Sequence, residues 1–331
     1  MLGIVFAVSA NFVFAVSNVF FRKTEHDTSP SMINLFRTSV GVLSFILIAF
    51  FTNSISIVFL IPLDLIGLLI LSSLLGQVMG DTSYFFSQKY IGPTKALTIS
   101  LTYPFFTILI DIFFLNASFN AFILLSAVII SVGVGLIAYS KEKKAERRPK
   151  SPNQTEQPHI SSRKDTALGI IFAFLASISW AIGITITDLS MSKINDLFET
   201  ERLTSVVGSL IRFPIAAIVL LVINYSLYGL IKRKNQGKIE LRIHLTYQIR
   251  GRSIHSWLWL IAGALIGTSL GAYLFTEAAY LAGAVTMAIL VSTGPLFTLI
   301  LNLIINKERI TILGFIGVLT TLLGIIIISL F

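Results

Sequence analysis

Two long apolar segments of the chain each carry polar side chains at intervals of three and four residues. This spacing places side chains on one face of a helix. A carboxylate on the interior face of such a helix can bind a solute or take up and release a proton. The structural alternative is that each carboxylate is neutralised by a neighbour or lies at a lipid headgroup. The residues with this spacing are Gln77, Asp81 and Tyr84 in segment 63–87, and Tyr273, Glu277 and Tyr280 in segment 256–280.

Two arginines and two aromatic residues complete the candidate site. Arg37 and Arg212 lie inside apolar segments, where a basic side chain either faces the bundle interior or extends to the headgroups. Phe14 and Trp180 offer rings on which an organic solute can stack. Together with the carboxylates, these groups can line a polar cavity, and the mixture of acidic, basic and aromatic side chains suits a zwitterionic solute.

Small residues and prolines in the same segments predict how the helices pack and bend. Glycines spaced four residues apart let two helix backbones approach closely. A proline inside a helix removes a backbone hydrogen bond and predicts a kink, and interrupted helices border the solute site in many transporters. The residues concerned are Gly76, Gly80, Gly267, Gly271, Pro104 and Pro295.

The composition requires a membrane around these segments. Of the 331 residues, 55% are apolar and 12% are charged, and the mean hydropathy is +0.86. A soluble domain carries about 25% charged residues, so this chain has too little polar surface to cover a globule in water. The chain has no cysteine, which excludes disulfides and thiolate metal sites. All four histidines lie outside the apolar segments, and neither a metal nor another cofactor is predicted.

We therefore predict an all-α polytopic membrane protein with ten transmembrane helices. Residues 140–165 are charged and rich in proline and serine, which predicts a flexible linker. Residues 231–255 predict a basic loop near anionic headgroups or, because apolar and polar residues alternate there, a short strand outside the bilayer. The predicted spans are 2–21, 32–51, 63–87, 94–115, 119–139, 167–189, 204–230, 256–280, 284–305 and 311–331.

The linker separates two sets of five spans, residues 1–139 and 166–331, and the two sets resemble each other. Because each set has an odd number of helices, the second must enter the membrane from the opposite side, as inverted-topology repeats do. Arg37 and Arg212 correspond in the second span of each set, and Trp180 corresponds to Phe14 in the first. At an offset of 191 residues, the matching pairs include Gly76 and Gly267, Gly80 and Gly271, Thr102 and Thr293, and Pro104 and Pro295.

Lysine and arginine are distributed unequally between the two sides of the predicted spans. The loops after the odd-numbered spans contain 21 of the 25 basic residues, and the opposite side contains Lys193 and Arg202. By the positive-inside rule, the basic loops are cytoplasmic. We therefore expect a multi-pass protein of the plasma membrane with both termini outside. This distribution also accounts for the net charge of +9 without a nucleic-acid partner.

Several positions follow the pattern of a known family. Gly283 precedes an apolar helix that contains Pro295, and Glu308 lies in the turn before the last helix. Pro104 matches in the first half, whereas Ala117 stands where the pattern has a glutamate. With the paired arginines, these residues resemble the EamA-like family of the drug/metabolite transporter superfamily. The resemblance implies two repeats of five helices, and it implies cytoplasmic termini, in conflict with the distribution of charge.

The resemblance and the candidate residues predict a secondary transporter, either an exporter or an exchanger. Its solute would be small and polar or amphipathic, such as an amino acid or a related metabolite, and protons are the candidate coupling ion. The alternative is a nonenzymatic receptor or scaffold, which a ligand that binds without crossing the membrane would favour. An integral membrane enzyme is a weaker alternative, because the chain has neither a His-Glu-x-x-His pair nor a Walker loop. The oligomeric state is not predicted.

Overall fold

The computed structural model is helical throughout its regular elements, and it describes residues 2–22, 24, 30–91, 93–116, 118, 120–146, 163–200, 203–234, 254–297, 300–301 and 311–330. Seven helices of this described part are long and apolar enough to cross a membrane. Three shorter apolar helices accompany them, at Tyr103–Phe114, Ala284–Phe297 and Ile312–Ile328. The predicted all-α, multi-pass membrane class is therefore confirmed. The count of ten crossings and the inverted relation of the halves stay predictions.

The helices follow the predicted apolar segments closely. Those of the first half are α1 (Leu2–Arg22), α2 (Pro30–Phe51), α3 (Ile55–Val58), α4 (Leu63–Ser73), the π-helical segment η1 (Leu74–Gly80), α5 (Asp81–Ile91), α6 (Pro93–Ser100), α7 (Tyr103–Phe114) and α8 (Ala121–Glu146). Those of the second half are α9 (Arg163–Phe198), α10 (Thr204–Lys234), α12 (Ile254–Ala264), the π-helical segment η3 (Leu265–Leu270), α13 (Gly271–Ala282), α14 (Ala284–Val291) and α16 (Ile312–Leu330).

Two helices extend into the segment predicted as a flexible linker. α8 continues to Glu146, past the predicted end of its span at residue 139, and α9 already begins at Arg163. The added residues of α8 are mostly Lys, Glu and Ala, which favour helix strongly. The remaining linker residues, 147–162, and most of the predicted basic loop, 235–253, lie outside the described residues.

The elements of the two halves recur at the offset found in the sequence. α4 and α12 begin 191 residues apart, and so do η1 and η3. The helix is also interrupted at residues 101–102 and again at 292–293. Pro104 and Pro295 each lie two residues beyond an interruption and close to the start of the helix that follows, where a missing backbone donor costs nothing. The chain thus restarts its helix near each proline, whereas the sequence predicted a kink within one continuous helix.

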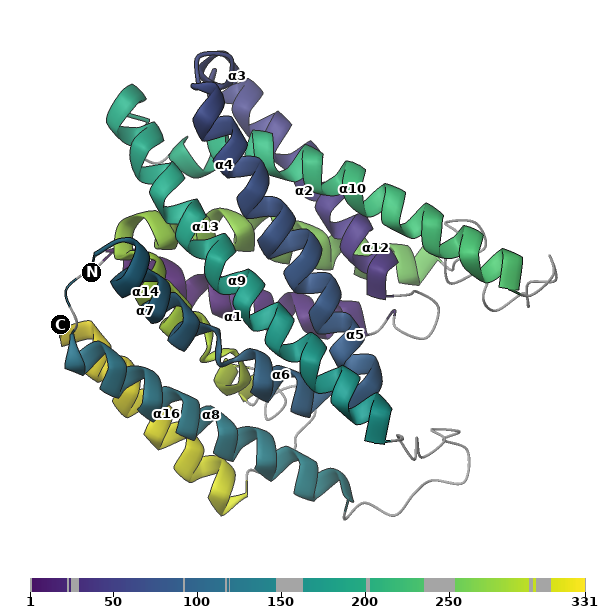
Figure 1. The fold of residues 1–331 in the computed structure, drawn as a ribbon, viewed down its shortest axis with the longest axis vertical. Helices are drawn as coiled ribbons and strands as arrows, with labels where there is room; N and C mark the ends of the chain where they lie inside the picture. The colour runs from purple at the N-terminus through teal and green to yellow at the C-terminus, as the bar shows by residue number, and fades with distance from the viewer. Residues whose placement is uncertain are drawn as a thin grey trace.

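Helices of one half pack mainly on helices of the other. α5 and η1 lie against α9, α1 lies against α13, and α2 lies against α10. α8 and α16 form a pair at the side of the bundle (Figure 1). Each of these contacts joins elements from the two sets of predicted spans, so residues of both halves surround the same interior.

Glycines occupy the closest crossings. A Cβ added to Gly183 in α9 would lie 2.9 Å from the Cα atom of Gly76 in η1. In the related crossing, a Cβ added to Gly267 in η3 would lie 2.6 Å from the Cβ atom of Ser17 in α1. Small residues therefore let η1 pack closely against α9 and η3 pack closely against α1.

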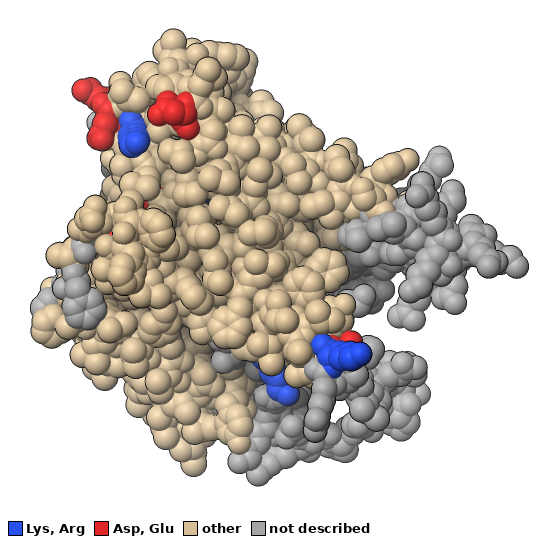
Figure 2. Space-filling model, in the orientation of Figure 1, with Lys and Arg blue, Asp and Glu red and all other residues tan. Residues whose placement is uncertain are grey.

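The outer surface is apolar over a broad belt. On the face shown in Figure 2, the charged side chains of the described residues gather at two opposite ends, and uncharged residues fill the region between them. Leu43, Phe113 and Leu221 are 63%, 72% and 57% exposed. A soluble monomer rarely exposes so extensive an apolar patch, so this belt is the surface that contacts lipid. The start of α1 and the end of α16 lie on the same side of the molecule (Figure 1).

Candidate functional site

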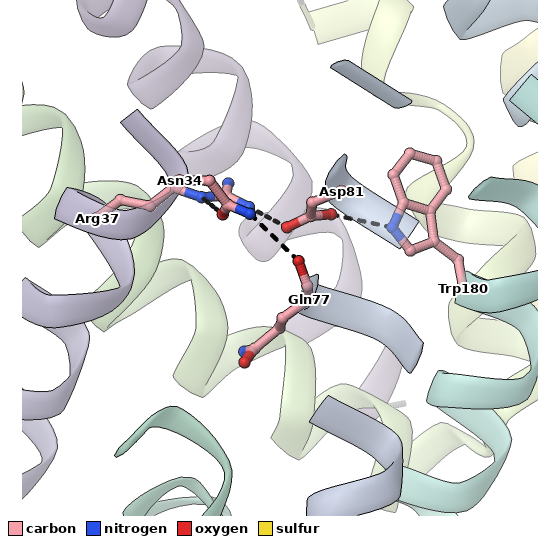
Figure 3. A network of polar contacts seen from close by, with 5 residues as sticks. All are labelled: Asn34, Arg37, Gln77, Asp81 and Trp180. Atoms are coloured by element: carbon pink, nitrogen blue, oxygen red, sulfur yellow. Dashed lines mark hydrogen bonds and ion pairs between the residues drawn. The ribbon is translucent and has the colours of Figure 1, made fainter. Parts of the chain in front are cut away.

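Arg37, Asp81 and Trp180 meet inside the bundle although they come from three helices. Arg37 lies in α2, Asp81 is the first residue of α5, and Trp180 lies near the middle of α9. The Arg37 guanidinium forms an ion pair with Asp81 Oδ2 through Nη2, and Trp180 Nε1 donates to Asp81 Oδ1 at 3.0 Å. The two partners approach the carboxylate from opposite sides (Figure 3). Each carboxylate oxygen therefore has its own donor.

Asn34 orients the arginine of this network. Its Oδ1 accepts a hydrogen bond from Arg37 Nε at 2.9 Å, and its Nδ2 donates to the backbone carbonyl of Gln77 at 3.3 Å. Gln77 lies in η1, and π-helical turns are often found at functional sites. The side chain of Gln77 points away from Asp81 (Figure 3), and its Oε1 is buried without a partner. Gln77 thus serves the network through its backbone, whereas the sequence predicted a contribution from its side chain.

Aromatic rings surround Trp180. The ring centroids of Tyr84 and Tyr103 lie 5.3 and 6.0 Å from that of Trp180. Trp180 itself covers Gly80, where an added Cβ would lie 2.5 Å from the indole. The absence of a side chain at Gly80 therefore lets the indole reach the carboxylate.

Phe14 occupies the related position in the other half. It covers Gly271, where an added Cβ would lie 2.9 Å from the ring, and it packs edge-on against Phe275 with centroids 6.1 Å apart. A phenyl ring has no N–H to donate. The two predicted aromatic residues therefore lie in matching places but differ in the hydrogen bond that they can offer.

The Arg37–Asp81 pair is accessible in spite of its depth. The side chains are 23% and 18% exposed. Asp81 lies ten residues before the end of α5, which is about 15 Å along the axis at 1.5 Å per residue. A charged group at this depth must face the protein interior or a water-filled cavity. The network therefore combines an anion, a cation and an aromatic ring, and part of the ion pair is exposed.

Glu277 belongs to α13 and lies apart from this network, where it contacts the first turn of α10. It is 1% exposed, it accepts the backbone N–H of Ser205 at 3.1 Å, and it also accepts the Ser205 hydroxyl. The first N–H groups of a helix have no partner within the helix, and its positive end attracts a carboxylate. Glu277 thereby ties α13 to the beginning of α10.

Arg212 is buried in the second half. It is 5% exposed, and its Nη1 donates to Thr276 Oγ1 at 3.4 Å. The predicted residues therefore do not form one cluster. One group contains Arg37, Gln77, Asp81, Tyr84 and Trp180, and Arg212 and Glu277 make separate contacts with α10 and α13.

Tyr273 lines a cavity of about 540 Å³ between α2, α10 and η3, together with Ser44 and Ser269. Ser269 belongs to Gly267-Thr-Ser-Leu-Gly271, the Gly-x-Ser-x-Gly spacing of some hydrolases. In those enzymes the serine is exposed on a turn between a strand and a helix. Here Ser269 lies inside η3 and donates to Ser44 at 2.7 Å. Its hydroxyl therefore joins two helices and is not placed as a nucleophile.

The sequence analysis did not single out Asn34 or Ser205. Asn34 precedes Arg37 by three residues, and this spacing places both on one face of a helix, so a signal for it was present. Ser205 gave no comparable signal, because its role depends on how α13 packs against the first turn of α10. Glu308, which supported the resemblance to a known family, lies outside the described residues.

Comparison with known proteins identifies the family. The model of the EamA-like transporter family matches residues 1–139 and 167–330. A protein of Archaeoglobus fulgidus described as an uncharacterized transporter is 26% identical over 332 residues, which cover 100% of this chain and 99% of the relative. A crystal structure of another protein shares the fold, with a TM-score of 0.71 and 12% identity, and covers 99% of this chain and 96% of that chain. Since the family match covers nearly the whole chain, the protein belongs to the EamA-like transporter family.

Proposed function

We propose that this membrane transporter is a secondary transporter for a small polar or amphipathic organic solute, such as an amino acid or a related metabolite. Residues 1–139 and 166–331 would form its two repeats, and the solute would cross by alternating access between them. The observation that carries the proposal is the accessible network of Arg37, Asp81 and Trp180. It unites an anion, a cation and an aromatic ring at a depth where only protein or water can surround them.

The network also suggests how transport is coupled. Asp81 joins α5 to α2 through Arg37 and to α9 through Trp180. A proton bound by the carboxylate removes its negative charge and weakens the pairing with Arg37, so α2 is released from α5. A zwitterionic solute has the same effect, because its ammonium group competes with Arg37 for the Asp81 carboxylate. Either event changes how tightly α5 is held to α2 in its own half and, through Trp180, to α9 in the other half.

The test is a ligand screen on the purified protein followed by measurements of flux. Amino acids and small metabolites are screened by thermal shift, and every compound that stabilises the protein is then assayed in proteoliposomes with and without a proton gradient. We expect at least one binder to cross the membrane and the gradient to change its rate. Preloading the vesicles with unlabelled solute distinguishes an exchanger from an exporter, because only an exchanger needs solute on both sides.

Flux absent for every binder, in vesicles that carry out transport by a control protein, would reject transport of those compounds and favour a receptor. Flux that ignores the proton gradient would leave transport in place and remove Asp81 as a proton site.

A further inference from the structure

The two arginines that correspond in the repeats have different surroundings. Around Arg37, Asp81 supplies a carboxylate and Asn34 supplies an amide oxygen. At the offsets that relate the halves, Ala272 stands for Asp81 and Ser209 stands for Asn34. Both arginines are therefore present, but the second half has no carboxylate at the position that corresponds to Asp81.

Arg212 is not neutralised by any residue that the structure describes. Within that part of the chain it forms no ion pair, and its one hydrogen bond is the 3.4 Å contact with Thr276. Its Nε is buried without a partner, and so is the hydroxyl of Ser209, one helical turn earlier in α10. Arg212 is 5% exposed and Ser209 is 0% exposed. Two donors that lack acceptors thus lie on the same face of one helix.

This arrangement lies deep in the membrane. Arg212 is eight residues from the start of α10, which corresponds to about 12 Å along the axis. A guanidinium buried at this depth without a partner strongly destabilises the folded protein, because its lost hydration is not replaced. A partner that is present during only part of the transport cycle would neutralise Arg212 and still allow the charge to be uncovered later.

A cavity lies next to this part of α13. Position 272 holds an alanine, so it supplies no carboxyl group to Arg212 as Asp81 does to Arg37 in the other half. Ala272 is only half-buried. Ser269 and Tyr273, which lie on either side of it in the chain, line the 540 Å³ cavity between α2, α10 and η3. Arg212 does not itself line this cavity, so the carboxylate would enter beside Ser269 and Tyr273 and reach Arg212 when this turn of α13 moves.

We infer that Arg212 binds the carboxylate of the transported solute. The planar guanidinium can bind a carboxylate through two parallel hydrogen bonds, from Nε and one of the Nη atoms, and the buried Nε of Arg212 has no partner among the described residues. The Ser209 hydroxyl is a further donor to the same anion. This inference rests on the proposed transport function and specifies it, since the solute must carry a carboxylate.

Sodium acetate is the probe, because it presents a carboxylate and almost nothing else. The melting temperature of the purified protein is measured with sodium acetate, ethylammonium chloride and sodium chloride at matched ionic strength. Acetate at tenfold excess over its dissociation constant should raise the melting temperature by about 2 to 4 °C, whereas ethylammonium should not. Arg212→Gln should abolish the acetate response. The matched control is Lys193→Gln, which removes an exposed cation from α9 and should respond as the parent does.

A second variant protects the test from a folding defect in Arg212→Gln. Ala272→Asp restores a carboxylate at the position equivalent to Asp81, so it should pair with Arg212, raise the melting temperature without ligand and eliminate the acetate response. An acetate response that persists in Ala272→Asp or in Arg212→Gln would overturn the inference.

Two further measurements distinguish a solute carboxylate from a lipid headgroup, and the role of Arg212 from transport itself. If phosphatidylglycerol stabilises the parent through Arg212 while acetate does not, the anion is a lipid headgroup and the inference is wrong. Uptake of carboxylate solutes that is unchanged in Arg212→Gln rejects the role of Arg212 and leaves transport standing. Acetate binding through Arg212 without flux of any solute supports the site and rejects transport.

Discussion

Asp81 is the residue on which the interior network depends, because it is the only member that contacts both α2 and α9 through side chains. We predict that Asp81→Asn folds but loses at least about tenfold in transport rate, the equivalent of about 1.4 kcal/mol in a rate barrier. The amide oxygen can still accept from Trp180, but the amide nitrogen would face the donors of Arg37, so this contact becomes unfavourable. Flux in proteoliposomes measures the loss, and the melting temperature reports folding.

Trp180→Phe is the companion variant, because Phe14 already occupies the related position in the other half. It removes one hydrogen bond to Asp81 and leaves the ion pair with Arg37 in place. We expect a smaller loss of rate than for Asp81→Asn. Wild-type rates and an unchanged dependence on pH in both variants would show that the network is structural.

Glu277 and Asp188 provide a contrast between two carboxylates that both accept backbone N–H groups. Asp188 Oδ2 accepts the N–H of Ala284 at 2.9 Å, at the start of α14, and an amide oxygen can replace it. Glu277 accepts two donors of Ser205 and is 1% exposed, so water does not screen its charge at the positive end of α10, whereas Asp188 is only half-buried. We predict that Glu277→Gln loses most transport or its dependence on a proton gradient, whereas Asp188→Asn transports as the parent does. Equal flux in the two variants, at equal melting temperatures, contradicts the assignment of Glu277.

At the scale of elements, the crossing of α9 with η1 sets how closely the halves can approach. A Cβ on Gly183 would lie 2.9 Å from the Gly76 backbone, whereas a Cβ on Gly76 would lie 3.9 Å from Gly183, at an ordinary contact distance. We therefore predict that Gly183→Ala lowers the free energy of unfolding by about 1 to 3 kcal/mol and that Gly76→Ala does not. Reversible unfolding in detergent measures both.

Each of these two variants is a matched control for the other, because Gly183 and Gly76 face each other across one helix contact. Equal destabilisation by both substitutions would mean that the helices are not packed with this orientation. Equal tolerance would mean that α9 and η1 can separate without loss.

The elements differ in how far the sequence could predict them. Apolar runs and the recurrence of Gly76, Gly80 and Pro104 at an offset of 191 residues were sufficient to locate the helices of both halves. The π-helical segments were not predictable, because apolar residues interrupted by glycine also occur in ordinary membrane α-helices and the wider turn depends on close packing. The end of α8 was missed for a related reason, since the residues up to Glu146 combine the charge of a linker with strong helix propensity.

The candidate site was predicted as a set of residue types, and its pairing was not. Charged side chains inside apolar segments were recognisable in the sequence, and Asp81 and Arg37 are indeed in contact. Which carboxylate meets which arginine depends on the contacts between helices. For that reason Glu277 was grouped with Tyr273 from their spacing, although the structure adds Ser205 as its hydrogen-bond donor.

At the scale of the whole molecule, the distribution of basic residues predicts that both termini are outside. The chain has no cysteine, so single cysteines can be introduced at Ser151 in the linker and at Ser56 in α3. Ser56 is exposed and is preferable to its neighbour Asn53, whose φ of 55° lies in the left-handed region that asparagine tolerates better than cysteine does. In intact cells, an impermeant thiol reagent should label the Ser56 site and spare the Ser151 site.

The opposite labelling pattern would place both termini in the cytoplasm, as the family resemblance implies. Lysing the cells before labelling is the control, because both cysteines should then react.

The two π-helical segments give the bundle a place where a helix can change its winding. Rewinding a π turn into an α turn shifts the register by one residue, and with 3.6 residues per turn this rotates the following helix by about 100°. Asp81 comes directly after η1, so such a twist would swing its carboxylate away from Arg37 and bring Gly80 to that position instead. Because η3 occupies the matching place in the other half, tightening of one segment together with relaxation of the other would open the bundle toward one membrane face and close it toward the opposite face.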